Sequence, residues 1–401
     1  MLVEALLFGA LIFLLWQSLR KPPGLPPGRW GLPLVGYIPL TRKSLEDQLQ
    51  DLWKQHGDIF LGRLEQWSSL AQQPPLLLAA ASRPWHGQVQ AGGGDSAPCA
   101  AIQEEHRETS GEGGADPLRP QSGRDQCDLA DGGKILIKHA DMMVIKETFF
   151  TYFYEEIEHH RATLDPDNPR DLIDGYLLEM EERKDDPETT CSDGDLAFVL
   201  FDLFLAGSDT TIHTFTWISG YLASYPNVQR KLHAEIDAVL PKGVLATLAD
   251  KPKMPYLEAV VNEVMRMISL VKFGVQHAAN RNTELGGYTI PKGTILNTSV
   301  FIIHSDSRYW DQPEKFMPER WLDEAGKFVS KKEGFLPFGV GKHSCIGENL
   351  SRVELFIFLT IIYQSFSVAP PPGKTIDLTP DNSSFLFHLP KFHDLVFTAR
   401  Q

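Results

Sequence analysis

The segment FLPFGVGKHSCIGENLSRVELF, at residues 335–356, constrains the fold more than any other part of the chain. It carries the order F-x-x-G-x-[RH]-x-C-x-G, made by the residues Phe338, Gly341, His343, Cys345 and Gly347. Two glycines let a backbone turn tightly and approach a flat group closely. Cys345 then lies at the start of a helix predicted from about 346 to 364, where free N–H groups and the helix dipole favour a thiolate. The segment therefore predicts a turn that presents an anionic sulfur.

The other cysteines, Cys99, Cys127 and Cys191, form no C-x-x-C pair and no dense framework. A disulfide scaffold or a structural zinc site is therefore not expected, and each fits a small buried residue or a free thiol. The formal net charge of −14 argues against nucleic acid as a partner, because binding phosphate needs a basic surface.

A long helix is predicted over residues 193–225. Ser192 and Asp195 offer a weak capping box at its start, and Pro226 ends it. Residues 197–206 are apolar on nearly all sides, which is typical of a helix buried through a core.

The sequence AGSDTT, at residues 206–211, lies in the middle of this helix. A buried carboxylate at Asp209 is costly unless it has a partner or a chemical task. Gly207 permits local distortion, and the Thr210 hydroxyl can bond back to the preceding turn. Threonine in a helix is otherwise more often a packing or surface residue, so AGSDTT alone is a weak signal.

Glu263 and Arg266, in NEVMRM, are three residues apart and share one face of a predicted helix. A second arginine, Arg320, lies in PERW at residues 318–321. An E-x-x-R pair arises easily by chance and is usually a solvated salt bridge, so the pair alone assigns no role.

Taken together, the cysteine segment, AGSDTT, the E-x-x-R pair and PERW resemble the cytochromes P450, and more closely the animal microsomal family-2-type members. The resemblance implies a mainly α fold with small β-sheets, incomplete in its N-terminal half. It also implies haem b as the cofactor, with Cys345 as the thiolate ligand of the iron. Such a ligand pushes electron density toward O–O cleavage.

The resemblance assigns roles to further residues, position by position. Asp209 and Thr210 are implied to pass protons, and Glu263, Arg266 and Arg320 to form a buried structural network. The residues implied to bind the cofactor are Phe338, Gly341, His343, Cys345, Gly347, His277 and Ala206, with the two histidines facing the haem propionates. The residues implied to line a substrate pocket are Val271, Phe273, Val275 and Phe385. The alternatives are a surface role for His277 and a core role for the pocket residues.

The N-terminus predicts a membrane anchor over residues 1–20. Residues 2–19 are almost wholly apolar and near the lower length limit for a bilayer span. Arg20 and Lys21 follow, which places that side in the cytoplasm and favours a retained signal anchor over a cleaved signal peptide. The proline-rich stretch 21–36 predicts a stiff hinge. We expect a catalytic domain over 37–401, cytoplasmic and held at the endoplasmic reticulum membrane.

The resemblance covers about residues 1–62 and 135–401 and is absent between them. Residues 62–133 are rich in Gly, Gln, Ser, Ala and Pro, which predicts a loop or disorder. The family's W-x-x-x-R helix has no match there, because Trp85 is followed by Val89 at the arginine position. The loss of a charged hydrogen bond to haem predicts weaker retention of the cofactor.

Hydrophobic periodicity predicts further helices at 44–56, 141–162, 170–184, 228–240 and 256–268. Strand-like runs are expected over 287–302, and HGDIF at 56–60 leads toward another strand.

The resemblance implies a monooxygenase that inserts one atom of O₂ into a lipophilic small molecule, a fatty acid, steroid or xenobiotic. Its electrons would come from NADPH through NADPH–cytochrome P450 reductase, with cytochrome b5 as a further candidate partner. Two alternatives stay open. One is a non-enzymatic remnant, and the other is a peroxide-using or isomerising haem-thiolate enzyme, which would not need the Thr210 relay.

Overall fold

The computed structural model describes residues 24–25, 28–29, 45–58, 61–62, 76–78, 139–381 and 383–400. The chain divides into two compact units: one combines Met1–Gly87 with Asp209–Gln401, and the other is Gln88–Ser208. The predicted anchor over 1–20 and most of the predicted hinge over 21–36 lie outside the described residues.

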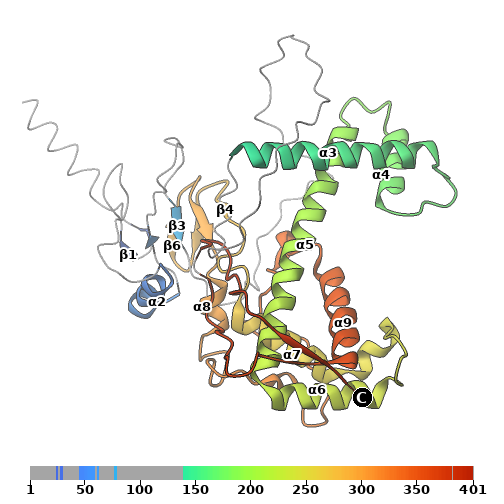
Figure 1. The fold of residues 1–401 in the computed structure, drawn as a ribbon. Helices are drawn as coiled ribbons and strands as arrows, with labels where there is room; N and C mark the ends of the chain where they lie inside the picture. Colours follow the sequence, from blue (N-terminus) through green and yellow to red (C-terminus); the bar gives the residue numbers. More distant parts are fainter. Residues whose placement is uncertain are drawn as a thin grey trace, which may run out of the picture. The chain divides into compact units, whose positions relative to one another are not determined.

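Most of the described elements are helices (Figure 1). In chain order they are β1 (Gly28–Arg29), α2 (Leu45–His56), β2 (Leu61–Gly62), β3 (Leu76–Leu78), α3 (His139–Ala162), α4 (Leu172–Glu182), α5 (Asp193–Ser224), α6 (Pro226–Val239), η1 (Leu248–Lys253), α7 (Pro255–Ile268), β4 (His277–Ala278), β5 (Thr283–Leu285), β6 (Tyr288–Ile290), β7 (Ile295–Asn297), α8 (Val300–His304), η2 (Pro318–Trp321), η3 (Gly341–His343), α9 (Glu348–Ser365), β8 (Phe366–Ala369) and β9 (Val396–Ala399). The prediction of a mainly α fold with small sheets is confirmed.

The sheets of the described part have two or three strands each. β7 pairs with β3 in parallel and with β4 antiparallel, while β5–β6 and β8–β9 are antiparallel pairs. Gly286 and Gly287 connect β5 to β6 with φ of 56° and 82°, the left-handed pair that a two-residue hairpin turn requires. The strand-like run 287–302 contains β6 and β7 as expected, but its last residues belong to the helix α8. β3 lies in the stretch predicted as loop or disorder, so that expectation was wrong for residues 76–78.

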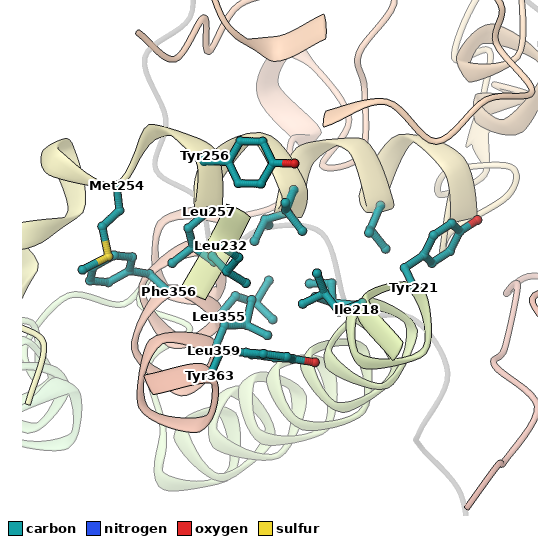
Figure 2. Packing of buried hydrophobic residues seen from close by; sticks show 14 of the residues in the cluster. Ile218, Tyr221, Leu232, Met254, Tyr256, Leu257, Leu355, Phe356, Leu359 and Tyr363 are labelled. Atoms are coloured by element: carbon teal, nitrogen blue, oxygen red, sulfur yellow. The ribbon is translucent and has the colours of Figure 1, made fainter. Parts of the chain in front are cut away.

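The core of the larger unit is formed by α6, α7, α9 and the C-terminal part of α5. Figure 2 shows Ile218, Leu232, Leu257 and Leu359 from these four helices pointing toward one another, and all four side chains are fully buried. α6 and α7 each begin with a proline, Pro226 and Pro255, whose missing N–H costs nothing in the first turn.

The unit Gln88–Ser208 has a core of its own, made by α3, α4 and the start of α5. Ile157, Leu177 and Leu196 are almost fully buried in it. Asp171 caps α4 by accepting hydrogen bonds from the N–H groups of Ile173 and Asp174.

α5 begins as predicted, since the Asp195 N–H donates to Ser192 Oγ at 3.1 Å and Ser192 Oγ donates to the Asp195 carboxylate. The prediction that its apolar middle is buried was wrong. Leu203, Phe204 and Leu205 are 37–51% exposed. A helix that is apolar all round needs neighbours on every side. The Phe204 ring contacts Phe149 of α3, but the described residues leave this stretch of α5 partly uncovered. Of the described helices, α5 is the one long and apolar enough to cross a membrane, a test that core helices also pass.

Candidate functional site

Cys345 lies on a tight turn between Phe335 and α9. Gly339 and Gly341 have φ of 73° and 78°, a conformation that side-chain-bearing residues rarely adopt. The turn closes where the Cys345 N–H donates to the Phe338 carbonyl oxygen at 2.8 Å. Gly341 was expected from the motif, whereas Gly339 was not. Gly347 instead has an ordinary φ of −85° and is the N-cap of α9.

The Cys345 side chain is a free, exposed thiol. Its carbonyl oxygen accepts a hydrogen bond from the Glu348 N–H at 3.4 Å, so the cysteine lies directly before the first turn of α9. A Cβ at Gly347 would lie 3.8 Å from Cys345 Sγ. The sulfur is thus placed beside the N-terminal end of a long helix.

Two histidines lie together near this turn. His277 in β4 and His343 in η3 have ring centroids 5.2 Å apart and planes at 71°. Both side chains are exposed. They come from segments 66 residues apart in the numbering, and their ring nitrogens together offer donors for carboxylate groups.

The E-x-x-R pair and Arg320 meet in a buried cluster around Glu263. Arg266 makes two hydrogen bonds to the Glu263 carboxylate, at 2.8 and 3.0 Å, and Arg320 Nε makes one at 3.0 Å. The Trp321 indole and the Met317 N–H also donate to this carboxylate, at 2.9 and 3.0 Å. Five donors to one buried carboxylate fix α7 against the PERW turn, and the sequence signalled only the three charged members.

Asp209 and Thr210 lie on a stretch of α5 that stays α-helical across 206–211. Asp209 is exposed, so the premise of a buried carboxylate was wrong for this structure. The hydroxyl of Thr214 donates to the Thr210 carbonyl oxygen at 2.8 Å. Thr211 Oγ1 donates to Glu354 of α9 at 3.3 Å, which ties α5 to the helix that follows Cys345.

The residues predicted to line a pocket separate into different environments. Phe273 is 2% exposed and packs in a core cluster with residues of α2 and α8, which is the core alternative left open by the sequence. Phe385 stacks on Phe273 with ring centroids 5.1 Å apart. Val271 forms an isolated antiparallel β-bridge with Phe387, and Val275 is 75% exposed.

An apolar groove of about 380 Å³ lies between α5 and α9. Its lining residues are Thr211, Ile212, Phe215, Phe358, Ile361 and Ile362. The four predicted pocket residues do not line it.

A comparison with protein families matches residues 133–395 to the cytochrome P450 model. The chain belongs to the cytochrome P450 family. The match begins where the compositionally unusual stretch 62–133 ends, and it includes the Cys345 turn, the Glu263 cluster and both histidines. The resemblance predicted from the motifs is therefore confirmed.

Individual cytochromes P450 are similar to this chain over parts of their length. Cytochrome P450 2L1 of Panulirus argus is 44% identical over 250 residues, which is 62% of this chain and 51% of that protein. Cytochrome P450 2U1 of Homo sapiens is 40% identical over 232 residues, 58% of this chain and 42% of that protein. Cytochrome P450 2B4 of Oryctolagus cuniculus is 41% identical over 255 residues, which is 62% of this chain and 51% of that protein. The chain spans about half the length of the curated relatives it matches.

The donor set around Cys345 fits the haem of a cytochrome P450. The exposed thiol can ligate iron, and the paired imidazoles of His277 and His343 can bind propionates. Val340 and Ile346, on the same turn, are 53% and 87% exposed, and such apolar side chains suit the face of a flat apolar ring.

Arg352 supports the turn and was missed from the sequence. Its guanidinium lies 5.1 Å from the centroid of the Phe338 ring, and it donates to Asn262 and Glu348, each at 2.9 Å. The spacing of Glu348 and Arg352 along α9 was a readable signal for one of these contacts. The cation–π contact with Phe338 and the bond to α7 depend on tertiary packing and had none.

Proposed function

We propose that this chain is a haem-thiolate monooxygenase that inserts one atom of O₂ into a lipophilic small molecule. The observation that carries the proposal is the exposed Cys345 thiol on a tight turn before α9, within a chain of the cytochrome P450 family. The surrounding thiol and imidazole donors support haem b as the proposed cofactor.

The cofactor would be held by Cys345 at the iron and by His277 and His343 at the propionates. Phe338, Gly341 and Gly347 would shape the turn, and Ala206 is a further proposed cofactor-binding residue, as the family resemblance implies. The bound haem would supply the oxygen chemistry. The chain's own contribution is to orient the sulfur, which the Glu263 cluster and the α9 N-terminus support.

Proton delivery is the task we propose for Asp209 and Thr210. The exposed Asp209 carboxylate can exchange protons with water, and the neighbouring Thr210 hydroxyl can pass one on. This pair distinguishes a monooxygenase from a peroxide-using or isomerising enzyme, which would need no such relay.

We further propose that NADPH–cytochrome P450 reductase supplies the electrons, with cytochrome b5 as a second donor. The apolar residues 2–19 followed by Arg20 and Lys21 support attachment to the endoplasmic reticulum membrane with the catalytic residues in the cytoplasm. The substrate would be a fatty acid, steroid or xenobiotic.

A second candidate is a chain that does not turn over. Two observations favour it: the exposed apolar middle of α5, and a match that covers only about half of the length of the curated relatives. Water that reaches a reaction centre weakens the electrostatic interactions there and promotes release of reduced oxygen without product.

Reconstitution with the reductase separates the two candidates. Product formed per NADPH consumed is measured with lauric acid and testosterone as probes, for the wild type, Thr210→Ala and the control Thr216→Ala. The monooxygenase predicts product, and a loss of about tenfold or more in that ratio for Thr210→Ala alone. A haem-loaded chain that consumes NADPH without product from either probe would support the second candidate.

A further inference from the structure

His304, the last residue of α8, is a buried side chain to which the proposed mechanism assigns no role. It is 1% exposed, and its imidazole joins two segments distant in sequence. Nδ1 lies 2.8 Å from Ser269 Oγ at the end of α7, and Nε2 accepts a hydrogen bond from the Leu336 N–H at 2.9 Å.

These partners allow a single protonation state. The Leu336 amide can only donate, so Nε2 must carry a lone pair. The Ser269 hydroxyl donates its proton to the Arg266 carbonyl oxygen at 3.1 Å, so it must accept from Nδ1–H. The neutral Nδ1–H tautomer therefore satisfies every polar atom of the group, and a protonated ring would place an N–H against the Leu336 N–H.

On one side His304 is attached to the Glu263 cluster. Its carbonyl oxygen accepts a hydrogen bond from Arg266 Nη1 at 2.8 Å, and Ser269, its imidazole partner, is the left-handed C-cap of α7 with φ of 42°. Both backbone and side chain of His304 are thus fixed to the rigid, buried end of α7.

On the other side His304 is attached to the turn that carries Cys345. The Leu336 carbonyl oxygen accepts from the Gly339 N–H at 3.2 Å, and the Cys345 N–H donates to the Phe338 carbonyl oxygen at 2.8 Å. The Phe335 ring stacks on the imidazole, with centroids 5.6 Å apart. The hydrogen bond from Leu336 is therefore the point where the Cys345 turn is anchored to α8.

We propose that His304 is a positioning residue that holds the Cys345 turn in place by accepting the hydrogen bond of the Leu336 amide. The consequence for catalysis rests on the proposed function, because it takes Cys345 as the iron ligand. The anchoring itself is a property of the polypeptide and can be measured with or without haem.

Two substitutions of His304 test the acceptor specifically. In His304→Gln the side-chain oxygen can take the place of Nε2, whereas the shorter side chain of His304→Asn reaches only the Nδ1 position. Amide hydrogen exchange of the intact 401-residue chain is followed by mass spectrometry over 335–345, with the α7 amides as the internal reference. We expect exchange of the turn to be about tenfold faster in His304→Asn and within about twofold of wild type in His304→Gln.

Two results would overturn the proposal. One is equal exchange of the turn in His304→Gln and His304→Asn, and the other is a His304→Asn chain whose α7 amides accelerate as much as the turn. Should His304→Asn not fold, Ser269→Ala provides the test. This substitution removes the acceptor of the His304 Nδ1–H, so the ring can also adopt the Nε2–H tautomer, which cannot accept from the Leu336 amide. A roughly threefold acceleration confined to 335–345 is expected there, and an unchanged turn would refute the role.

A spectroscopic readout links the anchor to the cofactor. In the ferrous carbon monoxide complex, His304→Asn should show a smaller fraction of thiolate-ligated haem than wild type, and His304→Gln should restore it. If wild type takes up no haem, the proposed function fails while the exchange data still decide the anchoring.

Discussion

α7 and α5 are both apolar helices, yet they differ in how much of their surface is buried. α7 has 14 residues, of which 11 are buried, including the charged pair Glu263 and Arg266. In α5, by contrast, only 17% of an apolar 18-residue stretch is buried. An apolar sequence shows that a helix has a surface that is stable only when another element covers it. Whether the surface is buried depends on the packing of the rest of the chain. The residues that support the Cys345 turn contact the well-packed α7, whereas the middle of α5 is exposed.

The largest expected effect lies in the buried cluster of α7. Glu263→Gln leaves Arg266 and Arg320 buried without their carboxylate, so we expect the free energy of unfolding to fall by about 3–5 kcal/mol. Urea denaturation measures it. The control is Glu348→Gln, which removes the more exposed ion pair to Arg352 and should cost no more than about 1 kcal/mol. Equal losses of the free energy of unfolding in both variants would show that the buried Glu263 cluster stabilises the fold no more than the more exposed ion pair does.

A matched pair of leucines tests the comparison between the two helices directly. Leu257 in α7 is fully buried, whereas Leu205 in α5 is 51% exposed. We expect Leu257→Ala to lower the free energy of unfolding by about 2–5 kcal/mol and Leu205→Ala to change it by less than about 0.5 kcal/mol. A loss above about 2 kcal/mol for Leu205→Ala would show that the middle of α5 is packed in solution.

The stability of the α7 region should also depend on pH through His304. Burial, and next the charge of Arg266, lower the pKa of His304 to about 3. The unfolded chain takes up this proton as the pH falls below about 6.5, and the folded chain does not until near 3. Stability is therefore complete above pH 6.5 and declines below it by about 1.4 kcal/mol for each pH unit.

Urea denaturation between pH 6 and 4.5 checks this prediction, with His304→Gln as the reference because it lacks the titrating group. The slope of the free energy of unfolding against pH should be smaller in the variant by the contribution of one proton, about 1.4 kcal/mol per pH unit. Identical slopes would mean that His304 is not buried as a neutral side chain.

Local signals in the sequence predicted the helices well. α5 and α7 end within one residue of the predicted positions, because prolines and hydrophobic periodicity mark their limits. α8 was predicted as strand, since a short run of apolar and β-branched residues does not distinguish the two states. β3 was missed because its partner β7 lies more than two hundred residues away in the chain.

In the candidate site, too, features set by local sequence were predictable and contacts between distant segments were not. The Cys345 turn could be predicted because its residue spacing is local, and the charges of the Glu263 cluster could be predicted from the family resemblance. The contacts of Trp321 with Glu263 and of His304 with Leu336 depend on distant segments meeting, for which the sequence carries no short-range signal.

Haem binding by Cys345 as a thiolate is tested most directly by the absorption spectrum of the ferrous carbon monoxide complex. The wild-type chain and the control Cys191→Ala, which removes the other free cysteine of the described part, should both show the thiolate-type band. Cys345→Ala should lose that band completely. Retention of the thiolate band in Cys345→Ala, or its absence from wild type supplied with stoichiometric haem, would contradict ligation of the haem iron by Cys345.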